Sequence, residues 1–159
     1  MPAVLDLYNK LADRPLGKRL FSLMFSHRAP YFATVRPYFA VLRPHYAEVH
    51  VPKRRKVHNH IKTVHVIAIA NGLEAAMGAL AEATIPDTKR WIPKGMTLDY
   101  TAKATSDIVC VAETDPADWD STDVPVRVSA TRDDGTVVAQ GVIDLYVTNK
   151  PAKVTPAQV

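Results

Sequence analysis

The stretch from His58 to Thr84 joins a polar loop to the longest apolar helix pattern of the sequence. The loop supplies Asn59 and His65, and the helix pattern carries a carboxylate, Glu74, at its border. A carboxylate beside an apolar surface can have a raised pKa that suits a general base, and amide and imidazole groups can orient or transfer protons. We therefore expect any catalytic site of this chain in this stretch.

From Val66 onward, apolar residues recur at the spacing of one helical face. These residues are Val66, Ile69, Ala70, Leu73, Met77 and Leu80. At about 100° per residue, Glu74 lies roughly 80° from the centre of this stripe, and Asn71 and Gly78 lie just beyond its edge. The remaining sides carry mainly alanine, so another backbone can approach closely. The pattern predicts a buried helix that a sheet wraps around.

Shorter patterns before this helix predict two further helices and a hairpin. The helices are expected over Val4–Leu11 and Leu16–Phe25, the strands over Thr34–Leu42 and His45–Val51, and the turn at Arg43–Pro44. Pro15 stands where the second helix can begin, and Pro37 has to lie at an edge or a bulge because it has no N–H for a ladder. With Lys18 and Arg19, the second helix also fits a membrane-surface helix, although packing on the domain or over a ligand pocket is the simpler interpretation.

The sequence after the long helix predicts a run of antiparallel strands. They are expected over Lys89–Thr105 with a break at Pro93–Gly95, and over Ile108–Thr114, Val124–Thr131 and Thr136–Thr148. Asp115–Asp123 is a polar loop, and Asp133–Gly135 contains the glycine that a hairpin turn needs. A hairpin, one long helix and a meander together predict an α+β domain whose sheet curls round the helix.

Composition restricts the class of protein. The 159 residues, 47% of them hydrophobic, fit one globular domain. The 20 basic residues only slightly exceed the 16 acidic ones, so the net charge of +4 does not by itself indicate nucleic-acid binding. The single cysteine, Cys110, excludes an intramolecular disulfide and favours the cytoplasm. We expect a soluble protein, because no apolar run approaches the ~18 residues of a membrane span and the N-terminus lacks a signal-peptide pattern.

The positions of Asn59, His65 and Glu74 carry a family resemblance. Six positions separate the first two, and nine separate the last two. This spacing resembles that of hotdog-fold acyl-CoA thioesterases of the phenylacetyl-CoA thioesterase type, which have an Asn, a His-Gly at the helix start and an Asp or Glu in the helix. The resemblance covers roughly residues 34–148, and NHIKTVHVIAIANGLEAAMG is most similar to a bacterial branch of largely unassigned function. Val66 replaces the common glycine and crowds the oxyanion position.

The two predicted N-terminal helices and the C-terminal stretch without periodicity divide the chain into residues 1–30 as an N-terminal helical extension, 31–150 as the hotdog domain and 151–159 as a mobile tail. For that domain, the resemblance implies a hotdog fold, an antiparallel sheet around one long central helix. It also implies hydrolysis of an acyl-CoA thioester to the free acid and CoA, without a cofactor. The backbone N–H of Val66, next to His65, would stabilise the oxyanion. Glu74 would activate water or attack directly, and Asn59 would orient the water or the thioester oxygen. In the family, the helix carboxylate and the Asn come from different subunits, so a homodimer or a dimer of dimers, a homotetramer, is expected.

Substrate-binding residues are expected in the basic cluster of Lys53, Arg54, Arg55 and Lys56, which can contact phosphates of coenzyme A, and at Asn71 on the helix. A solvated turn is the alternative interpretation of the cluster. The cluster is also the only support for a nucleic-acid-binding module, and no aromatic stacking pattern accompanies it.

Other interpretations of the site residues remain open. Glu74 can be a solvated or salt-bridged helix residue, Asn59 a turn residue, and His65 a helix cap or a core residue. A non-catalytic protein that binds acyl-CoA or fatty-acyl groups would need no Glu74. His58, His60 and His65 invite a metal interpretation, but no cysteine or carboxylate lies at matching spacing, so no metal site is expected. Cys110 lies in an apolar strand, where a buried, inert thiol is the norm.

Overall fold

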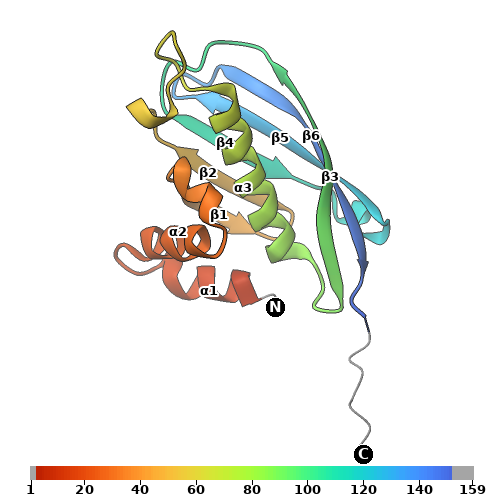
Figure 1. Ribbon diagram of the computed structural model, residues 1–159. Coiled ribbons are helices and arrows are strands. Elements are labelled where there is room, and N and C mark those ends of the chain that lie inside the picture. Colours follow the sequence, from red (N-terminus) through yellow and green to blue (C-terminus); the bar gives the residue numbers. More distant parts are fainter. Residues whose placement is uncertain (1–2, 152–159) are drawn as a thin grey trace, which may run out of the picture.

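The computed structural model describes residues 3–151, in which a curved sheet holds one long helix, α3 (Val66–Thr84), on its inner face (Figure 1). Ile69, Leu73, Met77 and Leu80 of the predicted apolar stripe are buried. Most of the small residues are buried too, because the sheet approaches the helix closely on several sides, while Ala68 and Ala70 are half-buried. This is the hotdog arrangement, and both the α+β class and the central helix predicted from the sequence are confirmed.

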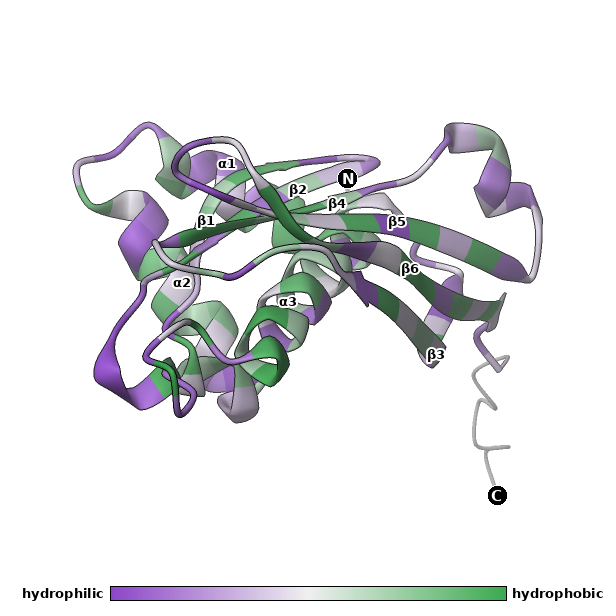
Figure 2. Cartoon of the chain, turned by 90° about the horizontal axis from the view of Figure 1, so that it is seen from above, coloured by the Kyte–Doolittle hydropathy of each residue, from purple (hydrophilic) through white to green (hydrophobic). Residues whose placement is uncertain are grey.

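The sheet has six antiparallel strands in the order β1-β2-β4-β5-β6-β3. The strands are β1 (Tyr38–Arg43), β2 (Tyr46–Val51), β3 (Lys89–Tyr100), β4 (Ile108–Glu113), β5 (Asp123–Arg132) and β6 (Val137–Asn149). Along β2, β4 and β5, buried residues alternate with more exposed ones, which gives the sheet one core face. The same alternation is visible as hydrophobic and hydrophilic bands along the strands in Figure 2.

Two helices precede the sheet, α1 (Ala3–Ala12) and α2 (Gly17–Arg28), followed by the 3₁₀ helix η1 (Pro30–Thr34). The helices close the outer edge of β1, where the ladder is interrupted between Phe39 and Val41. The carbonyl of Ala40 accepts hydrogen bonds from the Tyr8 hydroxyl at 2.8 Å and from Lys18 Nζ at 2.7 Å. The N-terminal helices therefore satisfy a sheet edge that would otherwise be open to other chains.

The second helix packs on the domain, as the simpler sequence interpretation predicted. Phe21 is buried, with its ring 5.1 Å from that of Tyr8 and 5.5 Å from that of Phe39, centroid to centroid. Leu20 and Leu23 remain exposed on the outer side of α2. The packing of Phe21 means that α2 is part of the same core as α3.

The predicted strand over Thr34–Leu42 is wrong in its first half. Residues 30–34 form η1, and the strand begins only at Tyr38. Pro30 occupies the first turn of η1, where proline is favoured, and Pro37 cannot donate to the ladder, so β1 begins after it. Pro37 therefore precedes an edge strand, close to its expected place.

The strand after the helix bends where the sequence predicted a break. The register of β3 against β6 shifts between Pro93 and Gly95. The chain leaves the sheet after Tyr100, so the expected strand up to Thr105 ends five residues early, and a short 3₁₀ helix, η3 (Pro116–Asp120), interrupts the predicted polar loop. A further 3₁₀ turn, η2 (Arg55–Val57), lies before α3.

The expectation that the chain has no membrane span depends on how α3 is placed. Over residues 3–151, α3 has the length and hydropathy of a span, but 67% of its most apolar window is buried inside the domain. Burial of this kind is typical of a core helix. Of the predicted mobile tail, residues 151–159, all but Pro151 lie outside the described part of the chain.

Candidate functional site

The loop before α3 is fixed at both of its ends. The N–H of His65 donates to the carbonyl of Val57 at 2.8 Å, and the N–H of Val64 donates to the carbonyl of Ala104 at 2.9 Å. His58 and Val64 also form an isolated antiparallel bridge. The start of α3 is therefore held against the segment that follows β3.

His65 is the N-cap of α3. Its Nδ1 accepts a hydrogen bond from the N–H of Ile67 at 3.1 Å, so the neutral ring carries its proton on Nε2. The N–H groups of Ala68 and Ile69 donate to the carbonyl of His65. Among residues 3–151, only the N–H of Val66 in this first turn has no acceptor. A free donor at the positive end of the helix dipole is suited to binding an oxyanion.

Asn59 uses its side chain within the loop. Its Oδ1 accepts from the N–H groups of Ile61 and Thr63 at 3.1 and 3.0 Å, and its Nδ2 donates to Thr63 Oγ1 at 2.8 Å. This is the turn geometry that the alternative interpretation of Asn59 described. One Nδ2 hydrogen remains for a ligand, so any contact with substrate would be a single donated hydrogen bond.

A cavity of about 320 Å³ lies at this end of α3. Asn59 and Val66 line it from the helix side, Tyr100 lines it from the end of β3, and Lys103 lines it from the segment after β3. The cavity therefore brings together two of the predicted catalytic residues. It also borders the end of the edge strand β3.

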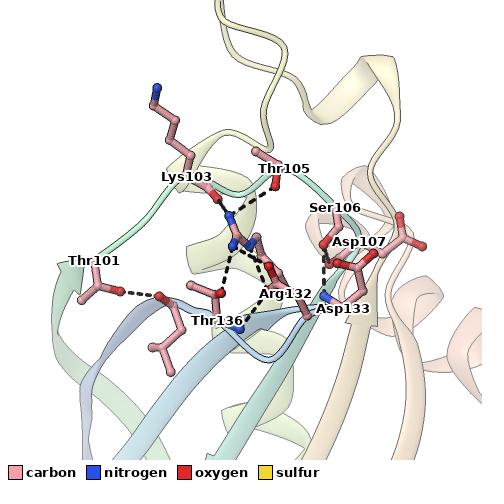
Figure 3. Close-up of polar contacts among 10 residues, drawn as sticks. Thr101, Lys103, Thr105, Ser106, Asp107, Arg132, Asp133 and Thr136 are labelled. Atoms are coloured by element: carbon pink, nitrogen blue, oxygen red, sulfur yellow. Dashed lines mark hydrogen bonds and ion pairs between the residues drawn. The ribbon is translucent and has the colours of Figure 1, made fainter.

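Arg132, at the end of β5, holds the segment after β3 that lines this cavity through Lys103 (Figure 3). Its guanidinium donates to the carbonyl of Lys103 at 3.2 Å and to Thr105 Oγ1 at 3.4 Å. It also makes a two-point ion pair with Asp134, at 3.1 and 2.6 Å, and this pairing holds the pKa of the Asp134 carboxyl well below its usual range. Because Val64 bonds to the intervening Ala104, Arg132 fixes the support of the α3 N-terminus.

Glu74 lies too far along the helix to act with Val66 of the same chain. Eight residues at about 1.5 Å each place the two backbones about 12 Å apart, whereas reacting groups have to approach to about 3–3.5 Å. The Glu74 side chain is partly buried and makes no hydrogen bond or ion pair within the described part of the chain. The structure therefore brings Asn59, His65 and Val66 together, and it does not bring Glu74 to them within one chain.

Asn71, expected to bind substrate, is buried and connects α3 to η1. Its Nδ2 donates to Thr34 Oγ1 at 3.0 Å and to the carbonyl of Tyr31 at 3.3 Å. Its Oδ1 is buried and has no partner among residues 3–151. Asn71 lines none of the cavities described here, so the structure provides no opening for a direct contact with substrate.

The basic cluster is divided by the fold. Lys53 turns back, its Nζ donating to the carbonyl of Thr105 at 2.9 Å, and Arg55 is exposed. Arg54 and Lys56 line a separate cavity with Arg36. Neither Arg36 nor Arg132 was predicted from the sequence as a functional residue. A cation directly before the Asp133–Gly135 turn was a usable signal for Arg132, but nothing local to Arg36 indicates that it meets Arg54.

The histidines and the cysteine form no metal-binding group within the described part of the chain. In residues 3–151, no group of three or more His, Cys, Asp or Glu side chains is placed to hold a metal ion. The Nε2 atom of His58 is buried and has no partner within that range, and His60 is exposed. Burial raises the pKa of the Cys110 thiol to about 12, so this thiol is inert, as predicted.

Comparison with known proteins identifies the family. Residues 17–147 match a family described as a domain of unknown function, DUF4442. The chain belongs to this family. A solved crystal structure with a genomics target name, which states no function, is 44% identical over 92% of this chain and 97% of that chain, with a TM-score of 0.80. No curated protein sequence matches the chain.

Two more distant structures carry functional names. A Pseudomonas aeruginosa protein of unknown function, called a probable thioesterase, is 21% identical over 86% of this chain and 98% of that chain, with a TM-score of 0.75. A Haemophilus influenzae thioesterase is 8% identical over 89% of this chain and 97% of that chain, with a TM-score of 0.73. At these identities the comparison establishes the fold, and the predicted resemblance to hotdog thioesterases is confirmed at that level.

Proposed function

We propose that this DUF4442 protein hydrolyses an acyl-CoA thioester to the free acid and CoA, at a site shared by two copies of the chain. The observation that carries the proposal is the N–H of Val66, which is free at the N-terminus of α3 and borders the cavity next to Asn59. A thioester carbonyl bound there would receive this hydrogen bond as its oxygen gains negative charge. Stabilisation of that charge by preorganised donors is the largest single contribution in many acyl-transfer enzymes.

The carboxylate for this site would come from Glu74 of a second copy. The edge strand β3 supports such a pairing, because one side of its backbone has no strand partner in residues 3–151. Met96 and Tyr100 are partners of the buried residues Ile143 and Ala139 on β6, so they lie on the inner face of the sheet, and yet they are exposed. A second copy paired along β3 would cover both residues and extend the sheet. We therefore propose a homodimer as the active form.

A non-catalytic protein that binds acyl-CoA or fatty-acyl groups is the second candidate. Two features favour it: the Asn59 amide is largely committed to its own loop, and Val66 places a side chain where the thioesterases that this stretch resembles have glycine. Such a protein would keep the cavity and the second copy. It would not depend on the Glu74 carboxylate.

The release of free thiol from short, medium, long and aryl acyl-CoAs distinguishes the two functions. The variants are Glu74→Gln, which removes the charge at almost constant shape, and Asn59→Ala. Glu113→Gln is the matched control, because Glu113 is an exposed carboxylate that makes no hydrogen bond or ion pair in residues 3–151. Sedimentation of each variant shows whether the dimer persists.

We expect turnover by the wild type and a loss of at least about a hundredfold in Glu74→Gln with the dimer intact. Glu113→Gln should match the wild type. If no acyl-CoA is turned over, or if Glu74→Gln turns over acyl-CoA as fast as the wild type, hydrolysis at this site is excluded. Direct titration of acyl-CoA then tests the binding function.

A further inference from the structure

A second cavity lies between η1 and the loop that follows β2. It has a volume of about 450 Å³ and is lined by Ala33, Thr34, Arg36, Arg54 and Lys56. It has no lining residue in common with the cavity at the start of α3. Three of its five lining residues are cations, and no carboxylate of residues 3–151 lines it.

Arg54 is held in this cavity with an unsatisfied donor. Its Nη2 donates to the carbonyl of Thr34 at 2.6 Å, while its Nε is buried and has no partner in residues 3–151. A buried N–H without an acceptor is unfavourable, and the loss is larger for a charged group. Burial and, to a smaller extent, the nearby charge of Arg36 lower the pKa of Arg54 below its ordinary value.

Arg36 faces the same cavity from an uncommon backbone conformation. Its φ of 52° lies in the left-handed region, which residues other than glycine rarely occupy. Its side chain makes no hydrogen bond or ion pair with residues 3–151. Two guanidinium groups thus repel each other across a cavity with no acid between them. A bound anion would neutralise this repulsion.

Asp107 and Glu48, two acids on or beside the adjoining groove, already have hydrogen-bond partners. A larger groove of about 920 Å³ shares Ala33, Arg36 and Arg54 with the cavity, and it also contains Asp107 and His50. Asp107 Oδ1 accepts from the N–H of Lys53 at 2.8 Å, and Glu48 Oε1 lies 2.7 Å from His50 Nε2. Within residues 3–151, neither acid forms an ion pair with Arg36 or Arg54.

We propose that Arg36, Arg54 and Lys56 bind a phosphate group. Guanidinium groups match phosphate oxygens with two parallel hydrogen bonds, and a dianion balances the neighbouring cations better than a single carboxylate would. The phosphate of an ester such as coenzyme A and free phosphate present the same chemistry to these residues. The site is distinct from the proposed catalytic site, and occupying it requires no hydrolysis.

Isothermal titration calorimetry at constant ionic strength tests the site with three ligands: inorganic phosphate, coenzyme A, and pantetheine, which has no phosphate. The variants are Arg36→Gln and Arg54→Gln, with Arg14→Gln as a control of equal charge. Arg14 is exposed and lies in the turn between α1 and α2. Arg36→Gln removes no hydrogen bond of the fold, and the unfolding midpoint of each variant verifies that it is folded.

We expect a phosphate-bearing ligand to bind the wild type and to bind Arg36→Gln and Arg54→Gln at least about tenfold more weakly. Arg14→Gln should retain the wild-type affinity. If the two arginine variants bind coenzyme A more weakly than the wild type does, but pantetheine equally well, the ligand is an ester phosphate. If the variants bind only inorganic phosphate more weakly, the ligand is free phosphate. The proposal is overturned if no phosphate-bearing ligand binds, or if the affinity is unchanged in Arg36→Gln and Arg54→Gln. It is also overturned if Arg14→Gln lowers the affinity as much as those two variants do.

Discussion

Gly72 of α3 lies directly against Cys110 of β4. A β carbon at position 72 would stand 2.8 Å from the Cys110 sulfur and 2.7 Å from Val51 Cγ2. Distances this short are below ordinary van der Waals contact, so the helix and the sheet touch at this point with no room for a methyl group. The close approach fixes how deeply α3 lies in the sheet, and hence where its N-terminus and Glu74 are placed.

Replacing Gly72 with alanine should therefore destabilise the protein despite the better helix propensity of alanine. Overpacking of a rigid core site typically costs about 1–3 kcal/mol. Gly78→Ala is the matched control, because a β carbon there would meet only the Trp91 ring at 3.6 Å. Helix propensity then favours alanine by about 1 kcal/mol. Urea unfolding measures both variants, and equal stabilities would show that the helix can shift without loss.

The Cys110 thiol should be unreactive in the native protein, and its contribution to stability should change with pH only in alkali. Burial raises its pKa from an ordinary 9.0 to about 12, so the unfolded chain loses this proton first as the pH rises. The thiol's contribution to stability is complete below pH 9 and declines up to about pH 12, by at most about 1.4 kcal/mol per pH unit. A thiol reagent should label the protein only after unfolding. Cys110→Ala should show a weaker alkaline decline in unfolding free energy.

Arg132→Gln should loosen the wall of the candidate site. It removes the hydrogen bonds to Lys103 and Thr105 and the ion pair with Asp134, and we expect a loss of about 1–3 kcal/mol. Hydrogen exchange should accelerate at the Val64 amide, which bonds to Ala104 in the same segment.

Arg127→Gln is the control for that variant. Its ion pair with Asp115 is exposed on both sides, so its removal should change stability by less than about 1 kcal/mol. Unchanged exchange at Val64 in Arg132→Gln would mean that the segment after β3 is held without the arginine.

Local patterns in the sequence predicted the long helix well. The apolar period begins at Val66 and Pro86 ends it, so the observed bounds of Val66–Thr84 agree with the prediction. The strand expected from Thr34 failed for a physical reason, because Thr34 is held in η1 by Asn71, 37 positions later. A hydrogen bond at that separation leaves no trace in a local pattern.

The contrast between local patterns and contacts of distant residues also applies to the site. Asn59, His65 and Val66 lie within eight residues, so their spacing sufficed to place them in one loop. Arg36 and Arg54 line one cavity because η1 and the loop after β2 lie at the same end of the sheet. That placement depends on the order of the strands in the sheet, which the spacing of residues along the sequence does not give. The place of Glu74 depends further on a second copy of the chain.

The N–H of Val66 can be removed without breaking the helix. Proline is favoured at the first helical position, and the extended conformation of His65, with φ of −66° and ψ of 139°, is the one that proline requires of its predecessor. Val66→Pro should therefore keep the fold and lower kcat about 100- to 1,000-fold, the effect of losing an oxyanion donor. Val66→Ala keeps the donor and relieves crowding, so it should be at least as active as the wild type. Circular dichroism and thiol release measure both. Full activity in Val66→Pro would exclude this N–H from catalysis.

Two inactive variants should restore activity when they share a dimer. One copy carries Val66→Pro and keeps Glu74, and the other carries Glu74→Gln and keeps the Val66 N–H. If each site combines the helix N-terminus of one copy with Glu74 of the other, a mixed dimer has one intact site and one doubly defective site. Co-expression with two different tags and sequential purification would isolate that species, which should show about half of the wild-type turnover per dimer, a value that follows from counting sites.

A site built within one chain would leave both sites of the mixed dimer defective, and its turnover would stay at the level of the single variants. The eight-residue separation along α3 favours the first result, because a rise of about 1.5 Å per residue keeps the two groups of one chain about 12 Å apart in either variant.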